Sequence, residues 1–335
     1  MVSYLKIKVK ELQFAPPSAI IHLTIILNNN AFHIQKGKHM TYQQFAEQIS
    51  NELTLFLKGE TIAEVHTSLK NNGVTRLGVT ISDPSINISP TIYLEDFYNQ
   101  YQNGVHFLDI IKNIMDIYEE VRFEHSWELG DLLHFESIKP KLAYKLIHKK
   151  ENLQLLQDIP SLSFHDFAIV FYLIMEISSS GSGTILITNG MLHSWNVDIR
   201  DLYEAAAANT PSVLPADFRP MQAVIREMLG SDSFSDIQDD NHMYILTNSI
   251  RHFGATAILY RGMLEQIGEE LHDDYYILPS SIHEVIILPR RYSPSPEDLD
   301  AMIVEINETQ VQPDEILSDH AYYYSRLHKS LFLTR

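Results

Sequence analysis

The sequence predicts an α/β (α+β) protein with an N-terminal α-β-β-β-α module and a larger mixed-sheet C-terminal region. Three observations predict this fold class. Apolar residues recur at helical spacing in several segments, other segments are short apolar or alternating runs typical of strands, and both kinds follow one another along the chain. The 335 residues are 45% hydrophobic and 20% charged, so the chain can bury a core and form two or three domains.

The first predicted module covers residues 40–121. A helix is expected over 40–57, where apolar residues recur every four positions and Thr41 with Gln44 has the pattern of a capping box. The Asn-Asn-Gly sequence at 71–73 lies between two alternating runs and predicts a β-hairpin, since Asn and Gly accept positive φ. The elements expected here are strands at 62–70, 74–82 and 90–94 and helices at 95–104 and 106–121.

A middle α/β region is expected over residues 122–230. The apolar run at 164–176 suits a buried strand, whereas 141–148 fits either a strand or a short helix. A Ser- and Gly-rich turn and a second strand follow, at 178–183 and 184–189. The alanine-rich helix at 197–210 is expected to stop before Pro211, because proline disfavours the α region in the residue before it.

The C-terminal α/β region is expected over residues 241–335, beyond an acidic polar loop at 231–241. Its predicted elements are strands at 243–248 and 254–260, a helix at 262–271, a hairpin at 276–289, a helix capped by Ser295, and a last helix from about Pro313 to Arg326. The similar segments TILITN and MYILTN suggest two similar halves side by side.

Residues 1–39 depart from the rest of the chain in charge. They hold five lysines and one acidic residue, whereas residues 40–335 hold 20 basic and 42 acidic residues. Their one long apolar run is about ten residues, short of the roughly 20 that a membrane span needs. The codons for QKGKHM can contain a ribosome-binding sequence before the ATG of Met40. We therefore expect residues 1–39 to be a translated leader or a disordered extension.

Composition and absent motifs exclude several kinds of function. The net charge of −18 disfavours nucleic-acid binding, because an acidic surface repels phosphate backbones. The chain has no cysteine, which excludes disulfides, thiolate metal sites and a cysteine nucleophile and fits a reducing cytoplasm. There is no phosphate-binding P-loop, no HExxH and no GxSxG, and the 16 histidines have no ligand spacing. We expect no cofactor and no metal site.

The hairpin at 276–289 carries the first candidate site, at His283 and Glu284. If the second strand begins at Ile282, these two side chains point to opposite faces of the sheet and cannot act jointly on one ligand. The next four residues are apolar on both faces, which is typical of a central strand covered on both sides. His283 is then either a structural histidine at the edge of the core or a single site residue.

The second candidate lies in the sequence SDHAYYYSR at 318–326. Ser, Asp and His side by side are not a catalytic triad, because such side chains must converge from separate segments. The alternatives are a helix N-cap at Ser318 or Asp319, and a site in which His320 approaches His283. The candidate catalytic residues are His283, Asp319 and His320, and the candidate binding residues are Glu284, Tyr322, Tyr323 and Arg326.

Several motifs together resemble a known family. They are NNGV followed by LGVTI, ISPTIYLEDFYNQYQNG, TILITN, YEAAAANTP, MYILTN, ATAILY, YILPSSIHEVIILP and INETQVQPDEILSDHAYYYSR. In this order they are similar to domain-of-unknown-function family 5688 of anaerobic Gram-positive bacteria, over residues about 40–326. The resemblance implies a bacterial cytoplasmic protein whose natural start corresponds to Met40. It implies no activity, so no catalytic residue is carried over from it.

Three functions remain open from the sequence. The first is a binding or interaction module without catalysis, whose partner is a protein or a small molecule and neither nucleic acid nor a membrane. The second is a hydrolase-like enzyme with a site around His283. The third is an accessory protein of a phage or mobile element. A second ionisable group brought to His283 by another segment would favour the enzyme, whereas ring nitrogens bonded to backbone would disfavour it.

Overall fold

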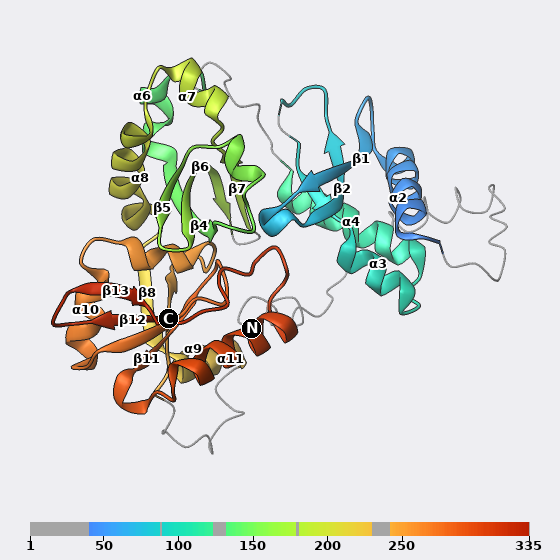
Figure 1. The fold of residues 1–335 in the computed structure, drawn as a ribbon. Coiled ribbons are helices and arrows are strands. Elements are labelled where there is room, and N and C mark those ends of the chain that lie inside the picture. Colours follow the sequence, from blue (N-terminus) through green and yellow to red (C-terminus); the bar gives the residue numbers. More distant parts are fainter. Residues whose placement is uncertain (1–39, 88, 123–131, 179–180, 230–241, 335) are drawn as a thin grey trace.

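A computed structural model describes residues 40–87, 89–122, 132–178, 181–229 and 242–334 (Figure 1). The expected leader at 1–39 and the acidic loop at 231–241 lie outside these residues. The described chain forms two parts that we call the N-terminal module, residues 40–121, and the C-terminal body, residues 132–334. None of the described helices is long and apolar enough to cross a membrane.

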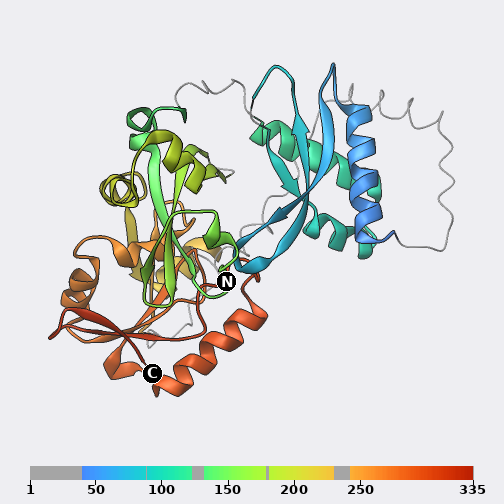
Figure 2. The same cartoon turned by 45° about the horizontal axis from the view of Figure 1, so that its top comes forward.

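The N-terminal module has the predicted α-β-β-β-α order (Figure 2). Helix α2 (Tyr42–Phe56) begins at the capping box, and β1 (Ile62–Leu69), β2 (Thr75–Ser82) and β3 (Thr91–Tyr93) form an antiparallel sheet in that order. Two helices, α3 (Glu95–Gln102) and α4 (Phe107–Val121), complete the module. Apolar residues of all these elements make a core of their own, which includes Phe45, Ile49, Val79, Ile81, Ile110 and Ile114.

The first part of the C-terminal body is a four-stranded antiparallel sheet. Its elements are α6 (Phe135–Ile138), β4 (Leu142–His148), β5 (Ser161–Phe164), β6 (Phe167–Ser178), β7 (Gly181–Leu186), α7 (Asn189–Trp195) and α8 (Ile199–Val213). Strand β6 pairs with β4, β5 and β7. The backbone N–H groups of Tyr144 and Leu146 in β4 donate to the hydroxyls of Thr210 and Thr256. These side chains cover the edge of β4, which would otherwise offer unpaired backbone groups.

A six-stranded antiparallel sheet forms the second part, in the order β13-β12-β10-β11-β9-β8. The strands are β8 (Ala216–Pro220), β9 (Tyr244–Asn248), β10 (Tyr275–Leu278), β11 (Val285–Pro289), β12 (Tyr322–Ser325) and β13 (Ser330–Leu333), and the helices are α9 (Met221–Leu229), α10 (Met263–Leu271) and α11 (Pro296–Thr309). Strand β11 is covered on both faces, as its apolar run predicts. Val285 and Ile287 enter the main core, and Leu288 packs against α11.

The two sheets of the body share one core. Buried residues from Leu142 in the first sheet to Leu331 in the second belong to a single apolar cluster. Strand β8 precedes the loop at 231–241 and pairs with β9, which follows it. The regions expected at 122–230 and 241–335 therefore contribute strands to the same sheet. The pairs within each sheet are antiparallel, so the body holds two antiparallel sheets where the sequence predicted mixed ones.

Three predicted elements are wrong. Residues 254–259 form a 3-10 helix, η5 (Gly254–Leu259), because an apolar run without periodicity fits a buried helix as well as a strand. Helix α8 continues through Pro211 to Val213, held by its buried face against β4. The expected last helix from Pro313 is absent, because residues 315–318 run antiparallel to 279–282 and the tyrosines form β12. Tyrosine is common in strands, where its ring packs on the pleated surface.

The tip of the β1–β2 hairpin joins the two parts of the molecule. We call residues 71–73 the hairpin tip, where Asn72 adopts φ of 58°. The Asn72 side-chain amide donates to the carbonyls of Pro313 (2.9 Å) and Ile316 (2.7 Å), and its backbone N–H donates to Asn152 Oδ1 (2.8 Å). Arg76 adds an ion pair to Asp314. Specific polar contacts therefore hold the N-terminal module on the body.

Replacing Asn72 tests this docking. Asn72→Ala removes the side-chain hydrogen bonds and places alanine in a left-handed conformation that asparagine tolerates better, so we expect a loss of about 2–4 kcal/mol in docking free energy. Asn72→Gly is the matched control, because glycine accepts that conformation and loses only the hydrogen bonds. Amide hydrogen exchange in residues 313–316 and urea unfolding measure the effect of each variant. If Asn72→Gly loses as much docking free energy as Asn72→Ala, the left-handed conformation of residue 72 contributes nothing to the difference between the variants.

Candidate functional site

His283 lies in a bend before β11, which begins at Val285, so the condition that the strand begins at Ile282 is not met. Its side chain is 8% exposed. Nδ1 accepts a hydrogen bond from the backbone N–H of Phe253 (3.3 Å), and Nε2 lies 3.3 Å from Oε1 of Glu315. His283 therefore has both an ionisable partner from another segment and a ring nitrogen bonded to backbone.

These two contacts indicate which ring nitrogen of His283 serves as the hydrogen-bond acceptor. Because Nδ1 accepts from a backbone N–H, its lone pair is in use and the ring proton belongs on Nε2, where it is donated to Glu315. A second proton on Nδ1 would face the N–H of Phe253. A general acid or base must be able to gain and release a proton toward its substrate. The His283 ring instead fixes two neighbouring segments to each other.

The loop that presents the Phe253 N–H is held in place by close packing. Arg251 and Phe253 both have φ of 54°, a conformation that costs energy for residues with a side chain. Thr247 Oγ1 donates to the His283 carbonyl (2.7 Å), and a β-carbon built on Gly254 would lie 2.5 Å from that same oxygen. Only glycine fits there, so the chain before β11 and the loop after β9 can lie in direct contact.

Glu315 connects this cluster to the hairpin tip. Burial raises the pKa of its carboxyl, but the hydrogen bond from His283 and the charge of Arg76 outweigh burial and bring that pKa below its usual value. Its backbone carbonyl accepts from the N–H of Ile282 (2.8 Å). The neighbouring Asp314 pairs with Arg76. The side chain of Glu315 is therefore ionised at neutral pH and sits where the module meets the body.

Two more ionisable side chains beside His283 are destabilised in their charged forms. Burial raises the pKa of Glu284, whose carboxylate makes no hydrogen bond with another described residue. Burial also lowers the pKa of His252 to about 3, with contributions from His283 and Lys145, so its ring is neutral in the folded protein. The His252 and His283 rings lie 5.1 Å apart. Both residues therefore couple folding to pH.

Asp319 and His320 lie in a different place from His283. Asp319 Oδ1 accepts from the Asn307 amide (2.8 Å), and Nδ1 of His320 lies 3.3 Å from Oδ2 of Asp300 without hydrogen-bond geometry. Both contacts are to α11. No helix begins here, so the predicted N-cap is wrong, and Ser318 instead has its backbone N–H bonded to the carbonyl of Pro279.

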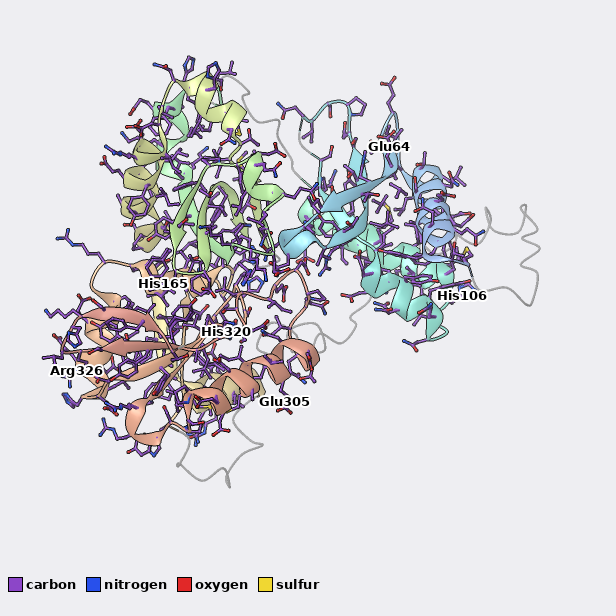
Figure 3. All side chains as sticks on the ribbon, in the orientation of Figure 1. Glu64, His106, His165, Glu305, His320 and Arg326 are labelled. Atoms are coloured by element: carbon purple, nitrogen blue, oxygen red, sulfur yellow. The ribbon has the colours of Figure 1, made fainter. Side chains whose placement is uncertain are left out.

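The predicted approach of His320 to His283 is also wrong. Ile282 pairs with Glu315 and Pro279 with Ser318, so the two segments run in opposite directions. Between Glu315 and Ser318 the chain therefore runs away from His283. Figure 3 shows His320 near the middle of the body and Arg326 at the far end of β12. The three candidate catalytic residues do not form one site.

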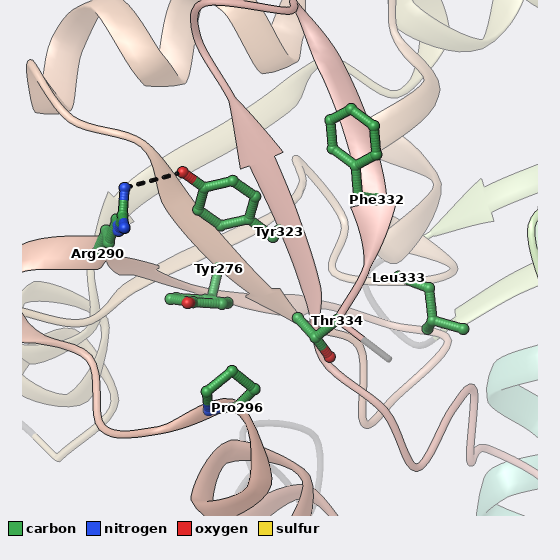
Figure 4. Close-up of a pocket in the computed structure, with 7 residues that line it drawn as sticks. All are labelled: Tyr276, Arg290, Pro296, Tyr323, Phe332, Leu333 and Thr334. Atoms are coloured by element: carbon green, nitrogen blue, oxygen red, sulfur yellow. Dashed lines mark hydrogen bonds between the residues drawn. The ribbon is translucent and has the colours of Figure 1, made fainter.

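The candidate binding residues lie along β12. Tyr322 is buried in the main core, while Tyr323 faces a cavity of about 320 Å³ lined by Tyr276, Arg290, Pro296, Tyr323, Phe332, Leu333 and Thr334 (Figure 4). Arg326 follows the strand, and its backbone N–H donates to Asp274 Oδ1 (3.0 Å). The hydroxyl of Tyr323 donates to Asp274 and accepts from Arg290 (3.4 Å). Tyr323 is thus the candidate that reaches a cavity, whereas Glu284 lies with the His283 cluster.

Sequence reasoning missed the partners that complete each cluster. Glu315 was not singled out, because it lies 32 positions from His283 and was assigned to a helix. Tyr276 is the first residue of the predicted hairpin and Arg290 directly follows it. Only the register between strands places these two residues beside Tyr323, and a local pattern does not contain that register. Among the described residues, no group of three or more His, Asp or Glu is placed to hold a metal ion.

Substituting Gly254 tests the close packing at His283. A β-carbon there would overlap Thr247 Oγ1, the His283 carbonyl and the Asn248 nitrogen, so we expect Gly254→Ala to lower the free energy of unfolding by about 3 kcal/mol or more. Gly190→Ala is the control, since its β-carbon would have ordinary contact with Thr188 at 3.7 Å, and a gain of about 0.4–1 kcal/mol is expected. Chemical denaturation compares the two. Similar free energies of unfolding for the two variants would contradict the close packing at Gly254.

The lowered pKa of His252 predicts a loss of stability in acid. The unfolded chain protonates this ring near pH 6.5 while the folded chain resists until about pH 3, so stability is full above pH 6.5 and falls as the pH drops between them. The loss reaches up to roughly 5 kcal/mol. We expect His252→Phe to flatten the profile of unfolding midpoint against pH. The exposed His106→Phe serves as control, and an equal flattening there would refute the assignment.

Comparison with known proteins places the chain in a family. No curated protein matches it, and no solved structure matches it. Residues 42–326 match a family of unknown function, DUF5688, over nearly the whole described chain. The match agrees with the resemblance inferred from the sequence motifs and with the range of residues that carry them. The chain therefore belongs to the family of unknown function DUF5688.

Proposed function

We propose that the protein is a non-catalytic binding module that captures an extended polypeptide segment at the β13 edge of its six-stranded sheet. One observation carries this proposal. Tyr276, Tyr323 and Phe332 lie directly opposite one another on the adjacent strands β10, β12 and β13. We call these three residues the aromatic row. It runs along one face of the sheet and reaches the last strand.

Helix α11 covers only part of that face. Leu278 and Leu288 pack beneath its Leu299 and Ile303, whereas the aromatic row continues past Pro296 at the start of the helix. Phe332 is 45% exposed. Large apolar side chains that remain exposed together mark surfaces for association. The cavity in Figure 4 is the hollow between the row and α11.

The backbone of β13 supplies the second element of the proposed site. Within the described chain, β13 pairs with β12 alone, so its outer backbone groups are available to another strand. A segment that adds to this edge gains main-chain hydrogen bonds, and its alternate side chains enter the neighbouring pockets. Strands lie about 4.8 Å apart, so a residue opposite Phe332 would extend the aromatic row by one step.

The cavity chemistry indicates which side chain enters it. Tyrosine and phenylalanine faces favour an aromatic or large aliphatic group. Arg290 contacts Tyr323 and Asp274 through Nη1, and its side chain is 63% exposed. Its guanidinium can bind a carboxylate with two parallel hydrogen bonds. We propose a partner segment that carries an apolar side chain and an acidic group.

The hydrolase-like alternative rests on His283. Its pairing with Glu315 from another segment favours a site, but the Phe253 N–H at Nδ1 opposes proton transfer, and Asp319 and His320 belong elsewhere. The bond to backbone therefore supports the binding module. A bacterial cytoplasmic setting is proposed from the family resemblance, and gene neighbourhood would test the link to a phage or mobile element.

The proposed binding is tested with the full chain and a library of random dodecapeptides displayed on phage. We expect selected peptides to combine an apolar residue with an acidic one and to bind in fluorescence anisotropy. Phe332→Lys interrupts the aromatic row and adds a charge to the edge, so at least a tenfold loss of affinity is expected.

Leu153→Lys is the matched control, because Leu153 is also exposed (59%) but follows β4 in the other sheet. It should retain wild-type affinity. The proposal is contradicted if no peptide is selected, or if both lysine variants bind equally well. Dimerisation that Phe332→Lys abolishes would assign the edge to a second copy of the chain and would also contradict it.

A further inference from the structure

The register of the six-stranded sheet determines which backbone groups of β13 face its open edge. In an antiparallel pair, residues that exchange hydrogen bonds with the neighbouring strand alternate with residues whose N–H and C=O groups point away from it. The backbone N–H of Thr334 donates to the carbonyl of Ala321 (3.4 Å), which lies opposite it when the β12–β13 register is continued by one residue. Phe332 lies two positions before Thr334 and therefore bonds to β12, whereas the backbone groups of Leu331 and Leu333 point outward.

A second bond in the same sheet leads to the same assignment. The backbone N–H of Arg290 donates to the carbonyl of Asp274 (2.9 Å), which continues the β10–β11 register by one residue. Bonded residues alternate along each strand, so Tyr276 bonds to β11 and its two neighbours on β10 bond to β12. Followed across β12, this alternation directs the backbone groups of Tyr323 toward Phe332 on β13. The outward direction of the two leucines therefore follows from two independent bonds.

The opposite edge of the sheet, at β8, is protected against an added strand. The backbone N–H of Ser249 donates to the carbonyl of Pro215 (2.9 Å), so Pro220 is one of the β8 residues whose backbone faces outward. Proline has no N–H to offer, and Arg219 and Asp217 add an ion pair to the same strand. Proline and charge both discourage strand addition. Strand β13 contains neither, so its edge is the one that can accept a further strand.

The charges beside β13 favour an acidic partner. Arg326 and Lys329 are exposed in the turn that leads from β12 into β13. Arg290 lies beside the aromatic row with 63% of its side chain exposed. Residues 40–335 carry 20 basic and 42 acidic side chains, so a group of cations at this edge is a local exception to the charge of the chain. Because complementary charge steers encounter and suppresses wrong partners, this edge fits an acidic extended segment.

We propose that the extended segment captured at β13 lies antiparallel to this strand and is recognised through the backbone groups of Leu331 and Leu333. This inference rests on the proposed function and specifies how the partner is recognised. The other strand pairs of the sheet are antiparallel, and antiparallel pairing is the more stable kind.

This pairing defines a recognition unit of three partner residues. The two that lie opposite the leucines each exchange two hydrogen bonds with them, and the residue between them lies opposite Phe332. Opposite residues that share no backbone bonds bring their side chains closer together, so an apolar side chain at this central position packs on Phe332. The unit is therefore an apolar residue between two residues whose N–H groups are free to bond.

Backbone methylation of the selected dodecapeptides tests this pairing on the wild-type full chain. The central residue is identified first, as the peptide position whose alanine replacement has no further effect on binding to Phe332→Ala. N-methylation of either flanking residue removes a donor that faces Leu331 or Leu333, so a loss of affinity of about tenfold or more in fluorescence anisotropy is expected. N-methylation of the central residue is the matched control. Its N–H points away from β13, so a change of less than about threefold is expected.

A pair of Leu333 variants provides a second readout from the side of the protein. Leu333→Pro removes the outward N–H and leaves the bonds to β12 in place, so it should bind the peptide about tenfold more weakly than Leu333→Ala, which keeps the N–H. Equal affinities of these two variants would overturn the pairing. A peptide that binds at Phe332 but is weakened by methylation of its central residue, or of no residue, would also overturn it and leave binding at the aromatic row intact. Selection of no peptide would refute the proposed function and this inference together.

Discussion

The chain between Pro313 and Ser318 is the constraint on which the rest of this structure depends. Its backbone pairs with residues 279–282 on one side and accepts the hydrogen bonds of Asn72 on the other. Its side chains bind Arg76 of the module through Asp314 and His283 of the body through Glu315. One short segment therefore fixes the hairpin tip, the bend before β11 and the position of β12, because extended backbone can bond on two sides at once.

The same junction concentrates groups that are costly to charge. Burial disfavours the ionised forms of Glu284, His252 and Lys145, whereas Glu315 stays ionised because it receives a hydrogen bond from His283 and faces Arg76. Partners, rather than depth alone, thus decide which groups keep their charge. The consequence is that the stability of this region depends on pH.

The six-stranded sheet leaves the outer edge of β13 unpaired within the described chain. The aromatic row ends at the open edge of β13, where apolar contact and main-chain hydrogen bonds favour an extended polypeptide. His283 does not take part in this edge. Its ring joins the Phe253 loop to Glu315 and so supports the geometry of the junction.

Local patterns in the sequence determined the family, the α-β-β-β-α module, the capping box at Thr41 and the doubly covered strand β11, because periodicity and turn residues act over a few positions. Only the tertiary structure decided the rest. Whether Gly254–Leu259 forms a strand, and whether Tyr322–Ser325 forms a helix, depends on which distant segment pairs with them. The partners of His283, Tyr323 and Lys145 likewise come from remote positions, since long-range pairing and burial, which no local pattern contains, set their environments.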